Sequence, residues 1–220
     1  MNLATELATF KEGFLARVPK ERAQMIQRYI DQSRGDAVAA GALRAGERAP
    51  NFALPNQNGQ RVELATRLKS SPAIVIFYRG GWCPYCNLEL RAYQHLLPEL
   101  RTQGVTLLAI SPQTPDASLS TAEKNALAFD VLSDQGNEAA RAFGIVFSLP
   151  NELRTLYTEV GHPLPELNGD QSWTLPVPAT FVVGSDGFIK LAHVELDYRL
   201  RLEPATALAA AIATSGARAA

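Results

Sequence analysis

The sequence predicts an α/β protein in which helices flank a central mixed β-sheet. Two uninterrupted runs of β-branched and other apolar residues, 73–78 and 105–110, are typical of strands buried on both faces. The amphipathic stretch between them predicts a helix, and a strand–helix–strand order pairs the two strands in parallel. Two more apolar runs, 180–183 and 188–194, flank the turn sequence Gly-Ser-Asp-Gly and predict an antiparallel hairpin. The sheet is therefore expected to contain strands of both directions.

Residues 1–40 predict an N-terminal helical arm that is separable from the rest of the chain. A first apolar stripe with helical spacing ends at Pro19, and a second stripe continues up to Gly35. The first stripe consists of Leu3, Leu7, Phe10 and Phe14. We expect this arm to pack on the body of the protein, and a dimerisation arm that gives a homodimer is the alternative.

The body is expected over residues 44–216. Asn58-Gly59 marks a turn near its start, and the strand over 73–78 leads to a helix that begins at Pro84. Pro98 is expected to kink or shorten this helix, because proline cannot donate the backbone hydrogen bond of a helix interior.

The remaining elements follow from the same patterns. In chain order we expect a strand over 105–110, a helix over 120–129, a strand at 131–132, helices over 137–143 and 151–160, the hairpin, and an Ala-rich helix from Pro204 to near Gly216. The helix over 151–160 lies in a Pro-rich connection, residues 147–176, whose length is typical of functional or mobile segments.

Composition and charge exclude several classes of protein. The formal net charge is −1 and no basic stripe is present, so we expect no nucleic-acid partner. No apolar run approaches the roughly 18 residues that a membrane span needs, and we expect no membrane partner. The N-terminus lacks the basic and apolar regions of a signal peptide, which favours the cytoplasm as the location.

Cys83 and Cys86 are the most informative residues, because they are the only two cysteines in the chain. If the strand ends near Tyr78 and the helix begins at Pro84, Cys83 lies at the N-terminus of the helix. Unpaired N–H groups and the helix dipole favour a thiolate there. Cys86 lies one turn deeper, and we expect it to be more buried and to have the higher pKa. These positions predict that Cys83 is the attacking sulfur and Cys86 the resolving sulfur.

Two other interpretations of the cysteine pair remain open. A structural zinc site needs four ligands, and the three histidines, His95, His162 and His193, lack the spacing of zinc ligands. We therefore expect no metal, and no cofactor. Two buried, unreactive thiols in a non-enzymatic binding module are the other alternative, against which the position at a helix start argues.

The residues around the cysteines resemble the active site of the thioredoxin fold. The sequence Gly-Gly-Trp82-Cys83-Pro-Tyr-Cys86 follows a strand and opens a helix, and its Cys-Pro-Tyr-Cys tetrad is similar to that of glutaredoxins. Val177-Pro178 resembles the cis-proline turn that faces the cysteines in this fold. The resemblance implies that Trp82, Val177 and Pro178 form walls of the substrate site.

A wider resemblance is to the peroxiredoxins of the alkyl hydroperoxide reductase/thiol-specific antioxidant family. Residues 46–55 resemble the opening hairpin of that family, and residues 130–134 together with 139–144 resemble its signature between the sheet and the next helix. The likeness extends over roughly residues 44–200. It implies a hydroperoxide substrate, an intramolecular disulfide and a thioredoxin-like electron donor.

Three departures from the peroxiredoxin pattern keep the substrate open. Gly80 stands where the family typically has a threonine that binds the peroxide, Arg79 occupies the loop where a proline is usual, and Pro178 stands where the family has an arginine. Arg79 is our candidate for the cation that lowers the pKa of Cys83. Two functions use the same cysteines: a thiol peroxidase, and a thiol–disulfide oxidoreductase that acts on protein or small disulfides.

Several neighbouring residues are given no role in the chemistry. We expect His95 to lie on the helix surface away from the sulfur, and Glu89 and Arg91 to be ordinary charges on a polar helix face. His162 and Trp173 are expected in a packed insertion, with a lid over the site as the alternative.

Overall fold

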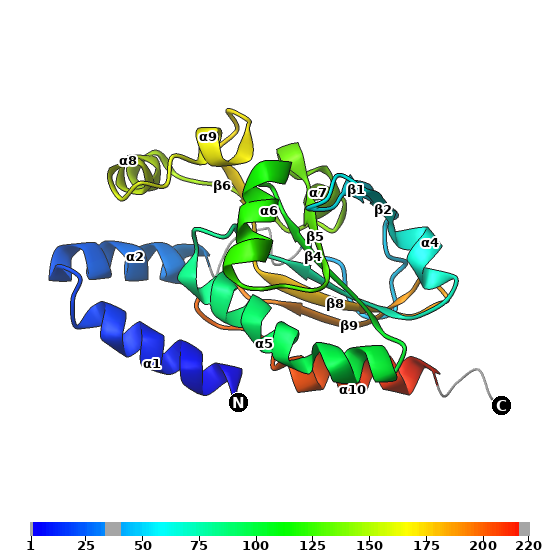
Figure 1. Ribbon diagram of the computed structural model, residues 1–220. Coiled ribbons are helices and arrows are strands. Elements are labelled where there is room, and N and C mark those ends of the chain that lie inside the picture. Colours follow the sequence, from blue (N-terminus) through cyan, green and yellow to red (C-terminus); the bar gives the residue numbers. More distant parts are fainter. Residues whose placement is uncertain (1, 34–40, 216–220) are drawn as a thin grey trace.

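A five-stranded mixed sheet forms the centre of the protein (Figure 1). The computed structural model describes residues 2–33 and 41–215. The strands lie in the order β5-β4-β3-β8-β9. Their bounds are β3 Ala73–Phe77, β4 Thr106–Ser111, β5 Asp130–Ser133, β8 Ala179–Val183 and β9 Ile189–Val194. β3 pairs in parallel with β4 and antiparallel with β8, which confirms the predicted mixed sheet.

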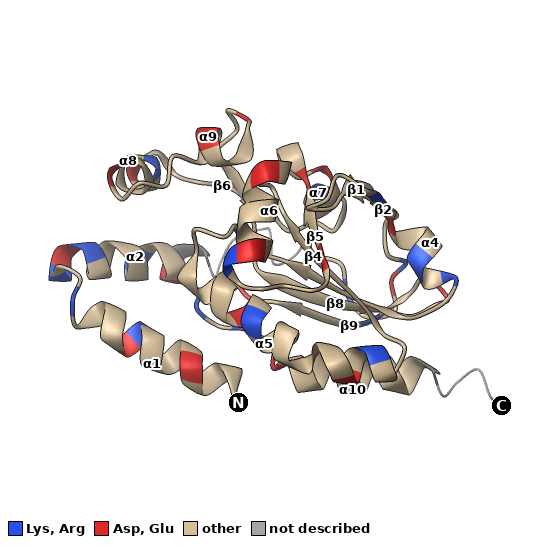
Figure 2. Ribbon diagram, viewed as in Figure 1, with Lys and Arg blue, Asp and Glu red and all other residues tan. Residues whose placement is uncertain are grey.

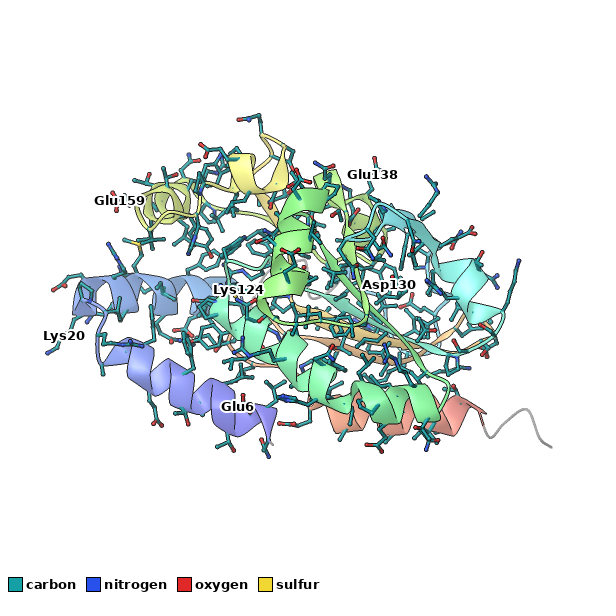
Figure 3. All side chains as sticks on the ribbon, in the orientation of Figure 1. Glu6, Lys20, Lys124, Asp130, Glu138 and Glu159 are labelled. Carbon is teal, nitrogen blue, oxygen red and sulfur yellow. The ribbon has the colours of Figure 1, made fainter. Side chains whose placement is uncertain are left out.

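Two hydrophobic cores cover the two faces of the sheet, because side chains alternate between faces along each strand. Ile74 and Ile76 of β3 point into the core that contains both cysteines, and Val75 and Phe77 point into the opposite core. Helices α1, α5, α6 and α10 supply the cysteine-side core, while α4, α7 and the hairpin β1–β2 supply the other. Figure 3 shows side chains filling the space between α5 and the sheet.

The remaining bounds are α4 Leu64–Leu68, α5 Pro84–Thr102, α6 Pro115–Lys124, α7 Glu138–Ala142, α10 Pro204–Ser215, β1 Ala53–Pro55 and β2 Arg61–Glu63, with a 3-10 turn at Gln135–Asn137. α5 continues past Pro98 to Thr102, so Pro98 does not shorten the helix, and a kink at this position stays a prediction. The end of the last helix near Gly216 lies outside the described residues.

Helix α6 begins five residues earlier than the predicted 120–129. The Thr114 hydroxyl accepts a hydrogen bond from the Ala117 N–H (3.4 Å), and Pro115 occupies the first helical position. A threonine cap followed by proline is a common helix start, and this signal outweighs the apolar spacing further along.

The long connection is a packed insertion and not an irregular loop. It contains β6 Val146–Ser148, α8 Asn151–Glu159, α9 Leu164–Asn168 and β7 Thr174–Pro176. β6 and β7 pair antiparallel at its base, and apolar residues of α8 and α9 form a third small core. This agrees with the expected helix over 151–160.

The N-terminal arm packs on the body of its own chain. It consists of α1 (Leu3–Leu15) and α2 (Lys20–Ser33), and the predicted continuation over 34–40 lies outside the described residues. Leu3 and Leu7 are buried in the cysteine-side core. The backbone N–H groups of Leu3 and Ala4 donate to the carboxylate of Glu203, the residue that precedes α10. α2 packs against the core of the insertion. A role of the arm in a homodimer stays a prediction.

Charged residues of both signs are interspersed along the elements (Figure 2). No helix within the described ranges is both long and apolar enough to cross a membrane.

If the arm is part of the folded core, Leu7→Ala should lower the free energy of unfolding by about 2–5 kcal/mol, the usual cost of truncating a buried leucine. Leu15→Ala on the same helix is the control, because Leu15 is 43% exposed. Urea unfolding followed by circular dichroism measures both. Equal, small effects of the two substitutions would show that the arm is not integral to the fold.

Candidate active site

Cys83 caps the N-terminus of α5 at the end of the loop that leaves β3. Its side chain is 1% exposed, that of Cys86 is fully buried, and both are free thiols. Burial opposes ionisation of Cys83, but hydrogen bonds from the side chain and backbone of Cys86 and the charges of Arg79 and Arg201 lower its pKa to about 6. Burial and the neighbouring Cys83 sulfur raise the pKa of Cys86 well above its usual value. The predicted order of the two pKa values is confirmed.

Two glycines let this loop pass close to its neighbours. Gly80 has φ +145°, and a Cβ atom at this position would lie 2.4 Å from Trp82 Nε1. A Cβ at Gly81 would lie 2.1 Å from Thr121 Oγ1, and the Gly81 N–H donates to Gln113 Oε1 at 2.6 Å. The peroxiredoxin-type threonine therefore has no room at position 80 in this loop.

Arg79 is a buried cation surrounded by aromatic rings. Its guanidinium carbon lies 4.1 Å from the ring centre of Tyr198, 5.0 Å from Trp82 and 5.6 Å from Tyr157. None of the ion pairs found among the described residues includes Arg79. Aromatic faces attract a cation without neutralising it, so its charge stays available to the Cys83 thiolate, as predicted from the sequence.

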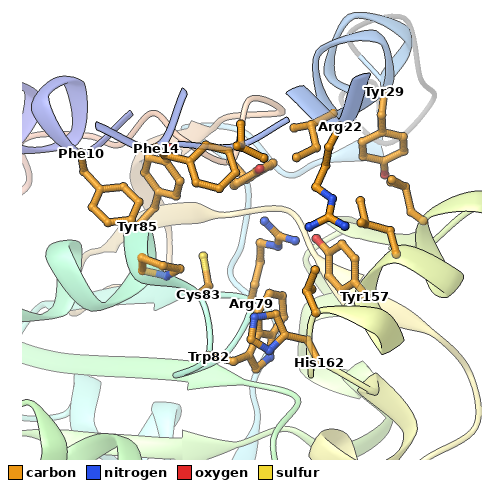
Figure 4. Close-up of a pocket in the computed structure, with 17 residues that line it drawn as sticks. Phe10, Phe14, Arg22, Tyr29, Arg79, Trp82, Cys83, Tyr85, Tyr157 and His162 are labelled. Atoms are coloured by element: carbon orange, nitrogen blue, oxygen red, sulfur yellow. The ribbon is translucent and has the colours of Figure 1, made fainter. Parts of the chain in front are cut away.

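Cys83 borders a cavity of about 240 Å³ (Figure 4). Three separate parts of the chain enclose it: the arm, the active-site loop, and the insertion. From the arm come Phe10, Phe14, Val18, Arg22, Ile26 and Tyr29; from the insertion come Leu153, Leu156, Tyr157, Val160 and His162; the loop and its surroundings supply Arg79, Trp82, Cys83, Pro84, Tyr85 and Tyr198. This lining is largely apolar, with two guanidinium groups and no carboxylate.

The insertion contributes more to the site than expected. The His162 ring lies 5.1 Å from the ring of Trp82, centre to centre, and both line the cavity. Burial lowers the pKa of His162 below its usual range. Trp173 packs instead against the core of the insertion. His95 is exposed on α5, as predicted.

Val177 and Pro178 do not line this cavity. Val177 packs in the core on the far side of the sheet from the cysteines. The prediction of a cis-proline turn is wrong, because no peptide bond among the described residues is cis. The Pro178 carbonyl accepts a hydrogen bond from the Glu195 N–H at 3.1 Å, which extends the pairing of β8 and β9 and fits an extended trans chain.

Glu89 does not lie on a polar helix face, so the expectation that it is an ordinary surface charge is wrong. It is fully buried, and its Oε2 accepts a hydrogen bond from Arg201 Nε at 2.6 Å. Arg201 Nη2 also lies 3.3 Å from Cys86 Sγ. Glu89 follows Cys86 by three residues and precedes the buried Tyr93 by four, a spacing that places all three on one face of the helix. This spacing is the feature of the sequence from which the burial of Glu89 could have been predicted.

No group of three or more His, Cys, Asp or Glu side chains suited to a metal ion occurs within residues 2–33 and 41–215.

Comparisons with known proteins agree with this geometry. Residues 45–192, more than half of the chain, match the model of the AhpC/TSA family. Peroxiredoxin Bcp of Escherichia coli strain K12 is 35% identical over 103 residues, which cover 47% of this chain and 65% of that protein. Peroxiredoxin Q, chloroplastic, of Gentiana triflora is 26% identical over 148 residues, covering 67% of this chain and 58% of that protein. The chain thus spans slightly less than two thirds of the length of these relatives.

Among solved structures, peroxidoxin BcpB from Mycobacterium tuberculosis superposes with a TM-score of 0.61. It is 21% identical to this chain, and the superposition covers 78% of this chain and 97% of the other. At this level of identity the likeness shows the thioredoxin fold of the peroxiredoxins, as predicted from the sequence.

Arg79→Met should raise the pKa of Cys83 above about 6, because the substitution removes a positive charge that favours the thiolate. Alkylation of Cys83 by iodoacetamide at pH 6 should slow by about fivefold for an increase of one unit, because the thiolate fraction falls from about one half to about one tenth. Mass spectrometry of the alkylated protein between pH 4 and 9 measures the profile.

Arg48→Met is the matched control, because Arg48 also lies over an aromatic ring, that of Phe188, but does not line the cavity. An Arg79→Met profile that coincides with the wild type would contradict the role assigned to Arg79.

Proposed function

Because the chain belongs to the AhpC/TSA family, we propose that it is a thiol peroxidase that reduces hydrogen peroxide and organic hydroperoxides through Cys83 and Cys86. The observation that carries this proposal is the Cys83 thiol, whose pKa is lowered to about 6 where it borders the cavity and contacts a second thiol. At neutral pH such a thiol is mostly thiolate, the form that attacks peroxides.

The reaction has two steps in the protein. The Cys83 thiolate attacks the terminal oxygen of the hydroperoxide and breaks the O–O bond, so that Cys83 becomes a sulfenic acid and the other oxygen leaves, with a proton, as water or an alcohol. The Cys86 sulfur then attacks the Cys83 sulfur, and an intramolecular disulfide and water form. An external dithiol, thioredoxin or a similar protein, restores both thiols.

The lining of the cavity favours organic hydroperoxides beside hydrogen peroxide. Apolar and aromatic side chains from the arm and the insertion face Cys83, and an alkyl or aryl group gains from leaving water for such a surface. In place of the missing threonine, the N–H groups of Arg79, which lines the cavity and whose charge acts on Cys83, would donate to the peroxide oxygens.

A thiol–disulfide oxidoreductase is the second candidate. The Cys-Pro-Tyr-Cys sequence and the contrast between the two cysteine pKa values suit disulfide exchange equally well. Against it, Cys83 is only 1% exposed beneath the arm, which leaves little access for a protein disulfide.

Partner and location follow from this chemistry as further proposals. A disulfide that must be reduced in every cycle requires a reducing compartment, and the cytoplasm fits that requirement. We also propose that the protein binds neither nucleic acid nor a membrane.

Cysteine variants test the peroxidase in an assay that couples thioredoxin and thioredoxin reductase to NADPH oxidation. Cys83→Ser should abolish turnover, because serine is not ionised at neutral pH. Cys86→Ser should consume about one equivalent of peroxide per chain and then stop, because the sulfenic acid is no longer resolved within the chain.

Residual steady turnover by Cys83→Ser would mean that Cys83 is not the nucleophile. If the wild type consumes no peroxide but reduces protein disulfides rapidly, the second candidate function replaces the first.

A further inference from the structure

A buried ion pair lies behind the resolving cysteine. Arg201 donates from Nε to Glu89 Oε2 at 2.6 Å, and its Nη2 lies 3.3 Å from Cys86 Sγ. The side chains of Glu89 and Arg201 are 1% and 2% exposed. One guanidinium therefore contacts both a carboxylate and the sulfur that must lose its proton during the second step.

The fold holds these groups in place from two sides. Cys86 and Glu89 share one face of α5, three residues apart. Arg201 belongs to the segment between β9 and α10, and its Nη1 donates to the carbonyl oxygens of Tyr198 and Leu200. A guanidinium bound at all three nitrogens has little freedom to move away from the sulfur.

Electrostatics limits this group to one negative charge. Arg201 supplies one permanent positive charge, and a second buried anion beside it would be left without a counterion. Glu89 and Cys86 thus compete for the charge of Arg201, which contacts both of them, while the more distant charge of Arg79 also acts on Cys86. In addition, Glu89 Oε1 is a buried oxygen with no hydrogen-bond partner among the described residues, and it is free to bind a proton.

We propose that Glu89 accepts the proton of the Cys86 thiol when Cys86 resolves the oxidised Cys83, with Arg201 holding the negative charge on either group. The proton leaves Cys86 Sγ for Glu89, and the new thiolate attacks the Cys83 sulfur. The S–S bond forms, the S–O bond of the sulfenic acid breaks, and hydroxide departs from Cys83. The proton that Glu89 accepted from Cys86 is returned to this hydroxide, so that water leaves, Glu89 is again a carboxylate and the net charge is unchanged.

The transfer keeps the negative charge beside Arg201, because the charge moves from one side of the guanidinium to the other, and it therefore costs less than separating the proton from the site. Releasing the same proton to water would leave both Glu89 and Cys86 ionised in a site without solvent. Burial raises the pKa of Glu89 to about 7 although Arg201 opposes the shift, so near neutral pH part of the Glu89 population is deprotonated and able to accept a proton. Burial and the Cys83 sulfur raise the pKa of Cys86, so this thiol needs a base beside it to react at that pH.

A purely structural ion pair would have the same geometry but a different response to neutralisation. If Glu89 only fixes Arg201, then Glu89→Gln removes a hydrogen-bonded anion and leaves Cys86 protonated. If the two anions compete for Arg201, the same substitution leaves Cys86 as the sole counterion, and Cys86 becomes a thiolate.

The first test is the thiolate absorbance at 240 nm, measured against pH in the Cys83→Ser protein, where Cys86 is the only thiol. This protein should show no Cys86 thiolate at pH 7, and adding Glu89→Gln should produce close to one thiolate per chain. Glu99→Gln is the control, an exposed glutamate on the same helix, and should produce none. A thiol that stays protonated in folded Glu89→Gln protein overturns the proposal.

A second variant tests whether the thiolate in Glu89→Gln protein depends on the charge of Arg201 or results from a disturbed structure around Cys86. Glu89→Gln combined with Arg201→Met replaces the pair with neutral side chains, and the Cys86 thiolate should disappear again at pH 7. A thiolate that persists in this double variant contradicts the role of Arg201.

The wild-type protein provides a measurement that needs no substitution at Glu89. In a single turnover, the rate of disulfide formation after Cys83 oxidation should rise with pH through about 7, as Glu89 loses its proton and becomes able to accept another. Glu89→Gln should move this rise to lower pH. A rate that is independent of pH between about 5.5 and 8.5 in the wild type overturns the proposal.

This inference deepens the proposed function and rests on it only for the kinetic test. The thiolate titration uses reduced protein without peroxide, so it can fail while the peroxidase assay succeeds, or succeed while that assay fails.

Discussion

The rest of the active site depends on one electrostatic constraint, the stabilisation of a thiolate that is almost out of contact with water. Cys83 is 1% exposed, and burial by itself opposes its ionisation. The start of α5 offers unpaired N–H groups, and Arg79 offers a charge that does not titrate. Arg79 is itself buried, so its own charge needs support from nearby groups that do not cancel it.

Aromatic rings give that support. Three rings surround the Arg79 guanidinium, and such contacts contribute about 0.5–2 kcal/mol each. The three rings come from the active-site loop, the insertion and the segment after β9. Stabilisation of one buried thiolate therefore depends on residues from three distant parts of the sequence. Helices α1 and α2 of the arm line the cavity beside Cys83, so the arm also limits which molecules reach this sulfur. Behind the site, Arg201 provides a second cation for the cysteine pair.

Local sequence patterns predicted the sheet, α5 and the order of the two cysteine pKa values, because these features depend on residues close together in the chain. Unbroken apolar runs identify β3 and β4 within one residue. α6 begins before the range that apolar spacing predicts, because Thr114 caps the helix and Pro115 occupies its first turn. Even here the necessary information was local.

The cavity and the environment of Glu89 were beyond such reasoning. Glu89 has a charged side chain on a long helix, and only the approach of Arg201, 112 residues further along, makes its burial tolerable. The cavity joins the arm to the insertion, two segments that the sequence does not relate to each other. Pro178 shows the opposite error, in which a local motif suggested a cis bond that the paired strand does not contain.

The most direct test of the central claim is stopped-flow tryptophan fluorescence of the reduced protein mixed with hydrogen peroxide, with Trp82 beside Cys83 as the reporter. The account predicts a fast phase whose rate rises linearly with peroxide concentration and far exceeds that of a free thiol of similar pKa. The phase should be absent in Cys83→Ser. A rate no greater than that of a free thiol, beside rapid reaction with oxidised glutathione or a protein disulfide, would contradict the claim that this site is built for peroxides.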